Sequence, residues 1–211
     1  PRPANAGPIV RQTNGVWAPE ASGVVVSLND VWAPDSQNAW SVGAQGTILH
    51  NSGAGAGWIT SQSGVANDLV AVHGSATNDI WAVGFQGKIL KWDGLTWSDV
   101  SSPVTLDWAD VWAGEEGKTV VVGAQGLIIR GDGEEWSEML NPHTGTTVTA
   151  IWGDSWNDLY AAGDGYIIHY DGNEEGEWTS YASTFAVQTW RGVCGSGPDN
   201  VLVVGAGGSV I

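Results

Sequence analysis

The stretch "DIWAVGFQGKILKWDGLTW", residues 79–97, decides the fold, because the same pattern recurs several times in the chain. The stretch "NAWSVGAQGTILHNSGAGAGW" (residues 38–58) precedes it, and "DLYAAGDGYIIHYDGNEEGEW" (residues 158–178) follows it. Five glycines that close a short apolar run mark the copies and stand 41, 39, 40 and 42 residues apart: Gly43, Gly84, Gly123, Gly163 and Gly205. Such a period is typical of repeat arrays in which each repeat is one supersecondary unit.

Each repeat predicts four short strands joined by tight turns. Apolar runs of about 4–7 residues alternate with polar, glycine-containing turns such as "FQG" and "DGLT". We find no 3.6-residue periodicity long enough for a helix. The strands are almost continuously apolar, which indicates that both faces of each sheet are covered. Four-stranded sheets that cover one another in this way are the blades of a β-propeller.

The sequence therefore predicts an all-β, single-domain β-propeller of about five four-stranded blades over residues 1–211. The expected blades are residues 28–64, 65–103, 104–144, 145–185, and 186–211 completed by residues 7–19. In this interpretation the N-terminal strands close the ring by pairing with the last blade. "GGSVI" (residues 207–211) also resembles the start of a third strand, so a fragment of a larger propeller with six or seven blades is the alternative.

Tryptophan is abundant, with 14 copies, and it recurs at equivalent positions of the repeats. Large flat rings at such positions are expected to pack as wedges between blades. The positions that carry them are Trp17, Trp58, Trp97, Trp136 and Trp178 at the fourth strand, and Trp32, Trp112 and Trp152 at the first. His73 and Cys194 replace tryptophan at the first-strand position, and we expect Cys194 to be a small buried residue.

The motif V-W-x(5)-N-D-x-W-A-V-G-x-x-G-x-I-L resembles the short repeats of β-propellers in bacterial secreted and surface proteins. The hairpin "WDGLTW" (residues 92–97) resembles a degenerate Asp-box, which is generally structural. The resemblance implies the fold and an extracytoplasmic location, at the cell surface or in the periplasm. Because such propellers serve many roles, it does not specify the function. The chain begins "PRPANAGP" without an initiating Met, so we expect a processed form or a fragment whose export signal lies outside it.

The chain is acidic, with 23 Asp and Glu against 7 Lys and Arg and a formal charge of −16. Such a surface repels phosphate backbones and anionic lipid headgroups, so neither nucleic acid nor a membrane is an expected partner. No apolar run approaches the roughly 18 residues of a membrane-spanning segment. The single cysteine excludes an internal disulfide.

The sequence does not predict catalysis. Asp30 and Asp110 occupy equivalent first-strand positions, but a glycosidase needs two carboxylates about 5–9.5 Å apart, and these residues belong to blades that are not neighbours. A sialidase would need a cluster of arginines, and the chain contains only four. We therefore expect a non-catalytic interaction module that binds a protein or forms part of a surface assembly. A lectin-like, carbohydrate-binding propeller is the alternative, and a glycoside hydrolase is less favoured.

One repeated position, four residues after the turn glycine, is basic in all five copies. It could form a ring that collects an anionic ligand, or each side chain could pair within its own blade. The five residues are Arg11, His50, Lys91, Arg130 and His169.

The sequence predicts no cofactor and no transition-metal site, because the four histidines are scattered. Two acidic turns offer weak candidate ligands for Ca²⁺, namely Asp132, Asp171 and Glu174, although such clusters are more often solvated turns.

Residues that break the repeat are the better candidates for binding. Trp156 stands in a polar turn where other repeats have Ser36 and Thr77, and Trp92 and Tyr170 end third strands where the first repeat has Asn51. Together they suggest an aromatic binding rim. We expect Trp156 to be exposed in the isolated chain and covered by a partner, because Trp is enriched at interface hot spots. The alternative is that Trp156 packs onto a neighbouring blade.

Overall fold

The computed structural model describes residues 8–211 except 54, 56, 101, 173–175 and 182–188. Its described residues form strands joined by turns, and the only helical segments among them are 3₁₀ turns of three residues. Four sheets have four antiparallel strands each, and a two-stranded sheet lies at either end of the series. The all-β, blade-like organisation that the repeat predicts is confirmed.

The first strands of the series make a hairpin and two complete blades. The hairpin consists of β1 (Pro8–Thr13) and β2 (Val16–Ala21). Blade one contains β3 (Leu28–Trp32), β4 (Ala39–Gly43), β5 (Ile48–Asn51) and β6 (Ile59–Ser61). Blade two contains β7 (Leu69–Ala76), β8 (Asp79–Gly84), β9 (Ile89–Trp92) and β10 (Trp97–Asp99).

Two more complete blades and a half-blade follow. Blade three contains β11 (Trp108–Ala113), β12 (Thr119–Gly123), β13 (Ile128–Gly131) and β14 (Trp136–Glu138). Blade four contains β15 (Val148–Ser155), β16 (Asp158–Gly163), β17 (Tyr166–Tyr170) and β18 (Thr179–Tyr181). The half-blade pairs β19 (Trp190–Gly195) with β20 (Val201–Gly205).

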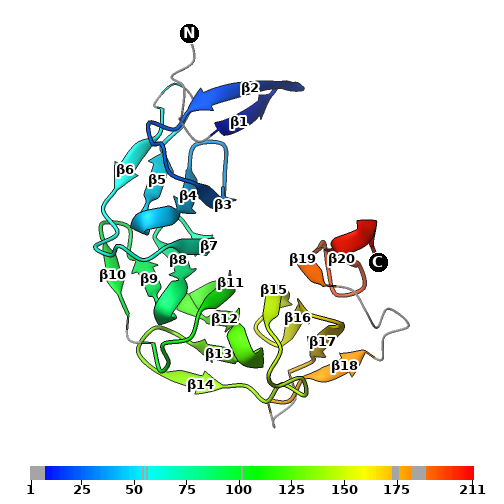
Figure 1. Ribbon diagram of the computed structural model, residues 1–211. Helices are drawn as coiled ribbons and strands as arrows, with labels where there is room; N and C mark the ends of the chain where they lie inside the picture. Colours follow the sequence, from blue (N-terminus) through cyan, green and yellow to red (C-terminus); the bar gives the residue numbers. More distant parts are fainter. Residues whose placement is uncertain (1–7, 54, 56, 101, 173–175, 182–188) are drawn as a thin grey trace.

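The blades form an open arc and not a ring (Figure 1). The predicted pairing of the N-terminal strands with the last blade is therefore wrong for this structure. β1–β2 lies beside blade one, where the Trp58 indole donates a hydrogen bond to Glu20. The free edge of β20 is taken by the chain's own end, because Val203 and Ile211 exchange two backbone hydrogen bonds of 2.9 and 3.0 Å. The C-terminal "SVI", which is the second copy of the third-strand sequence, thus occupies the position beside β20 in which β1 was expected.

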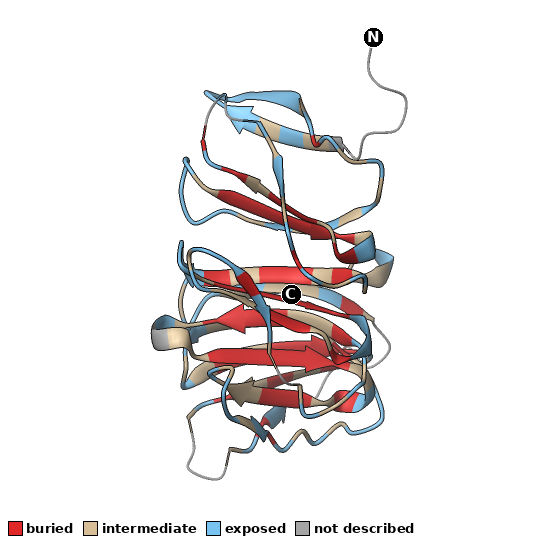
Figure 2. Ribbon diagram, turned by 90° about the vertical axis from the view of Figure 1, so that its left-hand side faces the viewer, coloured by how far each residue is buried: buried red, intermediate tan, exposed pale blue. Residues whose placement is uncertain are grey.

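The core lies in the junctions between blades, and each junction has the same construction. Two second-strand residues of one blade pack against the first strand of the next, as Trp40 and Val42 do against Leu69 and Val72. Val120 and Val122 pack in the same way in the cluster that holds Val148 and Ile151. Figure 2 shows buried residues through the complete blades and few in the N-terminal hairpin.

First-strand side chains set the spacing between blades. The aromatic residue of one blade lies against a small residue of the next: a Cβ added to Gly195 would lie 2.6 Å from the Trp152 ring, and one added to Gly74 would lie 2.7 Å from Trp32. Where the aromatic residue is the smaller His73, the next blade carries Ala113, whose amide donates to His73 Nδ1. Cys194, at the equivalent position of β19, is exposed, so the expectation that it is buried is wrong.

Candidate binding site

Trp156 forms the centre of a cleft between blades three and four. It lies in the tight turn between β15 and β16, and its ring packs against the buried cluster that contains Trp112 and Tyr170. Trp156 lines two hollows, one of about 370 Å³ and one of about 390 Å³. Trp156 is therefore partly buried, which corrects the expectation of a substantially exposed side chain. The ring packs against the neighbouring blade because burying an indole is more favourable in free energy than exposing it to water.

Arg130 on β13 holds Trp156 in place. Its guanidinium carbon lies 5.5 Å from the centre of the Trp156 ring and 5.6 Å from that of Tyr170. Arg130 Nη1 also donates a 3.0 Å hydrogen bond to the Tyr170 hydroxyl. A guanidinium can stack on aromatic faces while its five donors remain in one plane, so this arrangement still presents a cation to the hollow beside Trp156.

The two hollows share Trp156 and Lys118 as lining residues. Arg130 and Lys118, two of only 7 Lys and Arg in a chain of charge −16, both line one of these hollows. Acidic residues stand around them: Asp132 and Glu135 line one hollow, and Glu115 and Asp154 line the other. The cleft thus combines an aromatic surface with paired cations and an acidic margin.

The other two residues of the expected aromatic rim are not on the surface in the predicted way. Tyr170 is 2% exposed, so its ring supports Arg130 and cannot meet a partner. Trp92 is partly buried; its indole donates to the Thr77 carbonyl and its ring lies 4.8 Å from that of Trp40. Of the three, only Trp156 lines a hollow described above.

The five residues of the basic position make contacts inside the chain. Arg11 pairs with Glu20 at 2.6 Å, and His169 contacts Asp158 at 2.6 Å. His50 stacks on Trp40, while Lys91 lies 4.7 Å from the centre of the Trp81 ring and donates to the Asp132 carbonyl. Arg11, His50 and His169 thus make contacts within their own sheets, as the alternative expects, whereas Lys91 and Arg130 also contact the next blade.

Asp30 and Asp110 accept hydrogen bonds from backbone amides of the first strands. The two oxygens of Asp30 accept hydrogen bonds from the amides of Val31 and Val72, and those of Asp110 accept from Val111 and Ile151. Each carboxyl group therefore joins its own blade to the next. Burial raises the pKa of Asp110 to about 7; the two amide hydrogen bonds oppose this rise, and the charge of Asp30 adds to it.

The Ca²⁺ candidates divide between described and undescribed residues. Asp132 Oδ1 accepts the amides of Glu134 and Glu135, so it closes its own turn. Asp171 is described, whereas Glu174 lies outside the described residues. Within the part of the chain that the structure covers, no three His, Cys, Asp or Glu side chains are grouped to hold a metal ion. The same part of the chain contains no helix long and apolar enough to span a membrane.

No family model matches the chain, and no curated protein matches it either. Solved structures do resemble its fold. The structure described as YCF48 from Cyanidioschyzon merolae is 14% identical, with a TM-score of 0.75 over 99% of this chain and 76% of that one. YCF48 bound to D1 peptide gives a TM-score of 0.54 at 14% identity, covering 98% of this chain and 81% of that one. The RRP9 WD40 repeats give 0.71 at 12% identity, covering 96% and 68%. These likenesses establish the propeller fold.

One feature of the site could not be found in the sequence alone. Lys118 precedes a strand in a different repeat position from Arg130, and only the packing of blade four against blade three brings both beside Trp156. The sequence did give a signal for the site, because Trp156 departs from the repeat and lies in the turn that forms the cleft.

Proposed function

We propose that this chain is a non-catalytic, protein-binding propeller that holds an extended segment of a partner in the Trp156 cleft. The observation that carries the proposal is the pair of hollows that Trp156 and Lys118 both line, one of which Arg130 also lines. An aromatic surface beside fixed cations suits a peptide that presents an apolar side chain next to a carboxylate. The structure described as YCF48 bound to D1 peptide supports the proposal, because in it a chain of similar fold binds a peptide.

The carboxylates also support a binding role over hydrolysis. Asp30 and Asp110 have both oxygens engaged by strand amides, so neither is positioned as an acid or nucleophile toward a substrate. For a lectin, Tyr170 is buried and Trp92 partly buried, which leaves less aromatic surface at the blade edge than the sequence suggested. The extracytoplasmic location remains a prediction that rests on the resemblance of the repeat.

Selection from a library of random 12-residue peptides tests the proposal. Peptides enriched on the wild-type chain are measured against Trp156→Ser, Lys118→Gln and the matched control Trp17→Ser, whose indole is 69% exposed and distant from the cleft along the arc. We expect Trp156→Ser to weaken binding at least tenfold, Lys118→Gln to weaken it several-fold for acidic peptides, and Trp17→Ser to leave it unchanged.

Thermal melting of each variant accompanies the binding measurement. Trp156 packs on the core and on Arg130, so its replacement is expected to cost about 1–2 kcal/mol of unfolding free energy while the chain stays folded at 25 °C. Lys118→Gln leaves the contacts between Trp156 and Arg130 in place, and its own melting temperature separates an effect on stability from an effect on binding. Enriched peptides that bind Trp156→Ser and Lys118→Gln as tightly as the wild type would contradict the proposal.

A further inference from the structure

Blade four carries a carboxylate, an imidazole and a phenol that the proposed peptide cleft does not use. Asp158 on β16, His169 on β17 and Tyr181 on β18 come from three neighbouring strands. In the register of these strands His169 lies opposite Tyr160 of β16 and Thr179 of β18. Asp158 and Tyr181 are each two residues from these partners. Because side chains two residues apart on a strand share a face, the three groups lie on one side of the blade.

The contacts of His169 determine which of its nitrogens can accept a proton. His169 Nε2 lies 2.6 Å from Asp158 Oδ1, and an ionised carboxylate can only accept a hydrogen bond, so the neutral imidazole carries its hydrogen on Nε2. The other nitrogen, Nδ1, is therefore an acceptor, and it lies 3.5 Å from the Tyr181 hydroxyl oxygen. The Tyr160 ring stacks on the imidazole with 4.2 Å between the ring centres and holds it in this orientation.

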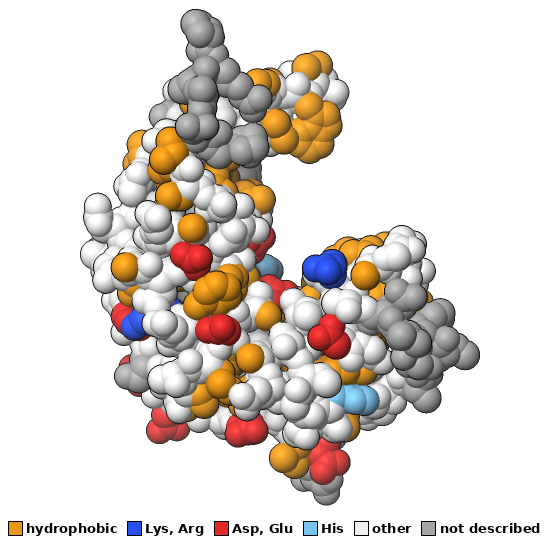
Figure 3. Space-filling model, viewed as in Figure 1, with side chains coloured by type: hydrophobic (Ala, Val, Ile, Leu, Met, Phe, Trp, Pro, Cys, Tyr) orange, Lys and Arg blue, Asp and Glu red, His pale blue; other side chains and the backbone are white. Residues whose placement is uncertain are grey.

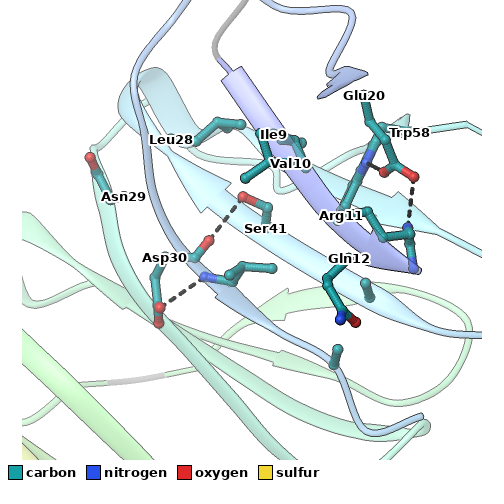
Figure 4. Close-up of a pocket in the computed structure, with 13 residues that line it drawn as sticks. Ile9, Val10, Arg11, Gln12, Glu20, Leu28, Asn29, Asp30, Ser41 and Trp58 are labelled. Atoms are coloured by element: carbon teal, nitrogen blue, oxygen red, sulfur yellow. Dashed lines mark hydrogen bonds and ion pairs between the residues drawn. The ribbon is translucent and has the colours of Figure 1, made fainter. Parts of the chain in front are cut away.

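The other copies of the basic repeat position lack this arrangement. A charged guanidinium or ammonium group has no acceptor nitrogen, which excludes the Arg and Lys copies; Arg11, for example, pairs with Glu20 (Figure 4). His50 in blade one is an imidazole, but Asn38 and Ser61 stand where blade four has the carboxylate and the phenol. Among the described blades, the three groups are therefore combined in this way in blade four.

Tyr181 is the member of the cluster that a reagent can reach. It is 51% exposed, whereas the side chains of His169 and Asp158 are 18% and 20% exposed. Tyr160 is the opposite case, because its hydroxyl donates a 3.0 Å hydrogen bond to the Pro198 carbonyl. Burial raises the pKa of Tyr160, and the charge of Asp158 adds to this rise. The exposed phenol thus faces a base, and the more buried one does not.

We propose that Tyr181 is a covalent acceptor site that takes an acyl group from a neutral activated ester, with His169 as its base and Asp158 as the residue that positions the base. A nucleophile, a base within reach of a hydrogen bond and a third group that orients the base are the requirements for such activation.

The transfer balances with these groups alone. The Tyr181 oxygen forms a bond to the carbonyl carbon of the ester while its proton passes to His169 Nδ1. The bond from that carbon to the alcohol leaving group breaks, and the leaving group takes the proton from His169. The products are a tyrosine ester and a free alcohol, and the imidazole returns to its starting state.

The charge of the protein favours a neutral donor over a phosphoryl or sulfuryl donor. The chain has a formal charge of −16, and on the face shown in Figure 3 acidic side chains are spread widely whereas basic ones are few. Asp158 itself lies beside the base. This field repels an anionic donor and does not repel a neutral ester.

Acetylation of the full chain by 4-nitrophenyl acetate tests the assignment. Peptide mapping by mass spectrometry locates the acetyl groups, and hydroxylamine distinguishes tyrosine esters, which it cleaves, from lysine amides, which it leaves intact. We expect Tyr181 to be acetylated at pH 7 at least tenfold faster than N-acetyltyrosinamide under the same conditions, and Tyr181→Phe to remove this product. Thermal melting shows whether each variant is folded.

The base is tested by His169→Gln, which should slow acetylation of Tyr181 at least tenfold and change its pH profile. With the base present, the rate levels off once the imidazole has lost its proton. Without it, the rate keeps rising as the phenol ionises, up to about pH 10. The matched control is His143→Gln, because His143 Nε2 lies 2.7 Å from the hydroxyl of Ser180, the residue before Tyr181. This control should change neither the rate nor the profile.

The positioning role of Asp158 is tested by Asp158→Asn and Asp158→Glu. An Asn side chain can donate to Nε2, which moves the imidazole hydrogen to Nδ1 and removes the acceptor from Tyr181. We expect the Asn variant to acetylate Tyr181 several-fold more slowly, with the same change of pH profile as His169→Gln, and the Glu variant to recover part of the rate.

The choice of a neutral donor is tested with 4-acetoxy-3-nitrobenzoate, which transfers the same acetyl group but carries a carboxylate. Relative to N-acetyltyrosinamide, Tyr181 should gain less with this reagent than with 4-nitrophenyl acetate, and added salt should reduce the difference.

Three results would overturn the proposal. The first is acetylation of Tyr181 no faster than that of N-acetyltyrosinamide. The second is a rate and pH profile that His169→Gln leaves unchanged. The third is consumption of the ester by Tyr181→Phe at the wild-type rate and in a way that still requires His169, because the imidazole would then be the nucleophile.

Discussion

Asp30 and Asp110 show how a single residue type can be required in alternate blades only. Each carboxyl group has two oxygens and accepts one strand amide from its own blade and one from the next. Blades two and four therefore need no carboxylate of their own and carry Ala71 and Ala150 at the equivalent positions. Two acids at equivalent positions of blades one and three thus make the same structural connection to the next blade.

The raised pKa of Asp110 makes this connection depend on pH. A carboxyl group that titrates near 7 when folded and near 3.8 when unfolded binds its proton more tightly in the folded state. Its contribution to stability is complete below about pH 4 and is lost as the pH rises to 7, by up to about 4 kcal/mol. We expect the unfolding free energy of the wild type, relative to Asp110→Asn, to fall over this range.

Urea denaturation of both proteins at pH 4, 5.5, 7 and 8 measures that difference, with the exposed Asp154→Asn as control. The difference is the useful quantity, because the many other carboxylates titrate equally in both proteins. A wild-type to Asp110→Asn difference that stays constant from pH 4 to 8 would show that Asp110 does not titrate abnormally.

At the scale of the blade, the fit between neighbouring first strands decides which residues are tolerated. An Ala at Gly195 would place its Cβ 2.6 Å from the Trp152 ring, and the three nearest atoms all belong to that ring. Between blades two and three the steric conflict is avoided differently, because the smaller His73 ring lies against Ala113. The identity of one residue therefore depends on its partner some 40 residues away in the next repeat.

We expect Gly195→Ala to lower the unfolding free energy by about 1–3 kcal/mol through overpacking. Combining it with Trp152→His should cost less than the sum of the two single changes, because His leaves room for the added methyl group. A double-mutant cycle from denaturant melts gives the coupling. Strict additivity of the two changes would mean that the ring moves aside and that the contact does not restrict the sequence.

The Q-G turns between second and third strands show the same dependence on local backbone. Gln45, Gln86 and Gln125 adopt left-handed φ angles of 58°, 59° and 60°. The amides of the first two donate to Asp68 and Asp107 just before the next blade's first strand. The turn thus connects a strand pair to the following blade, which offsets the cost of the left-handed conformation.

At the scale of the whole molecule, the arc has two differently built ends. The N-terminal hairpin rests on blade one through Glu20 and Trp58, and β20 is flanked by residues 209–211. Neither end contributes strands to the other in this structure (Figure 1). The stability of each end is therefore expected to be independent of the other.

Deleting residues 1–21 should raise amide hydrogen exchange in β6, beside Trp58, and leave β20 unchanged, because the hairpin contacts blade one through Glu20 and Trp58. Deleting Ser209–Ile211 is the matched change, and it should raise exchange at Val203, which donates to Ile211. Loss of protection in β20 after the N-terminal deletion would instead mean that the hairpin closes a ring in solution.

The sequence by itself determined the strands, their grouping in fours and the position of the repeat-breaking Trp156. These features depend on local chemistry: apolar runs make strands, glycine turns reverse them, and a period near 40 residues repeats the unit. Only the tertiary structure decided the placement of β1–β2, the engagement of the basic position inside the chain and the depth of Trp156 and Tyr170. Because the repeats are similar, a hairpin such as β1–β2 could pack against several equivalent blade surfaces. Packing between blades decides which surface it takes, and no single repeat encodes that packing.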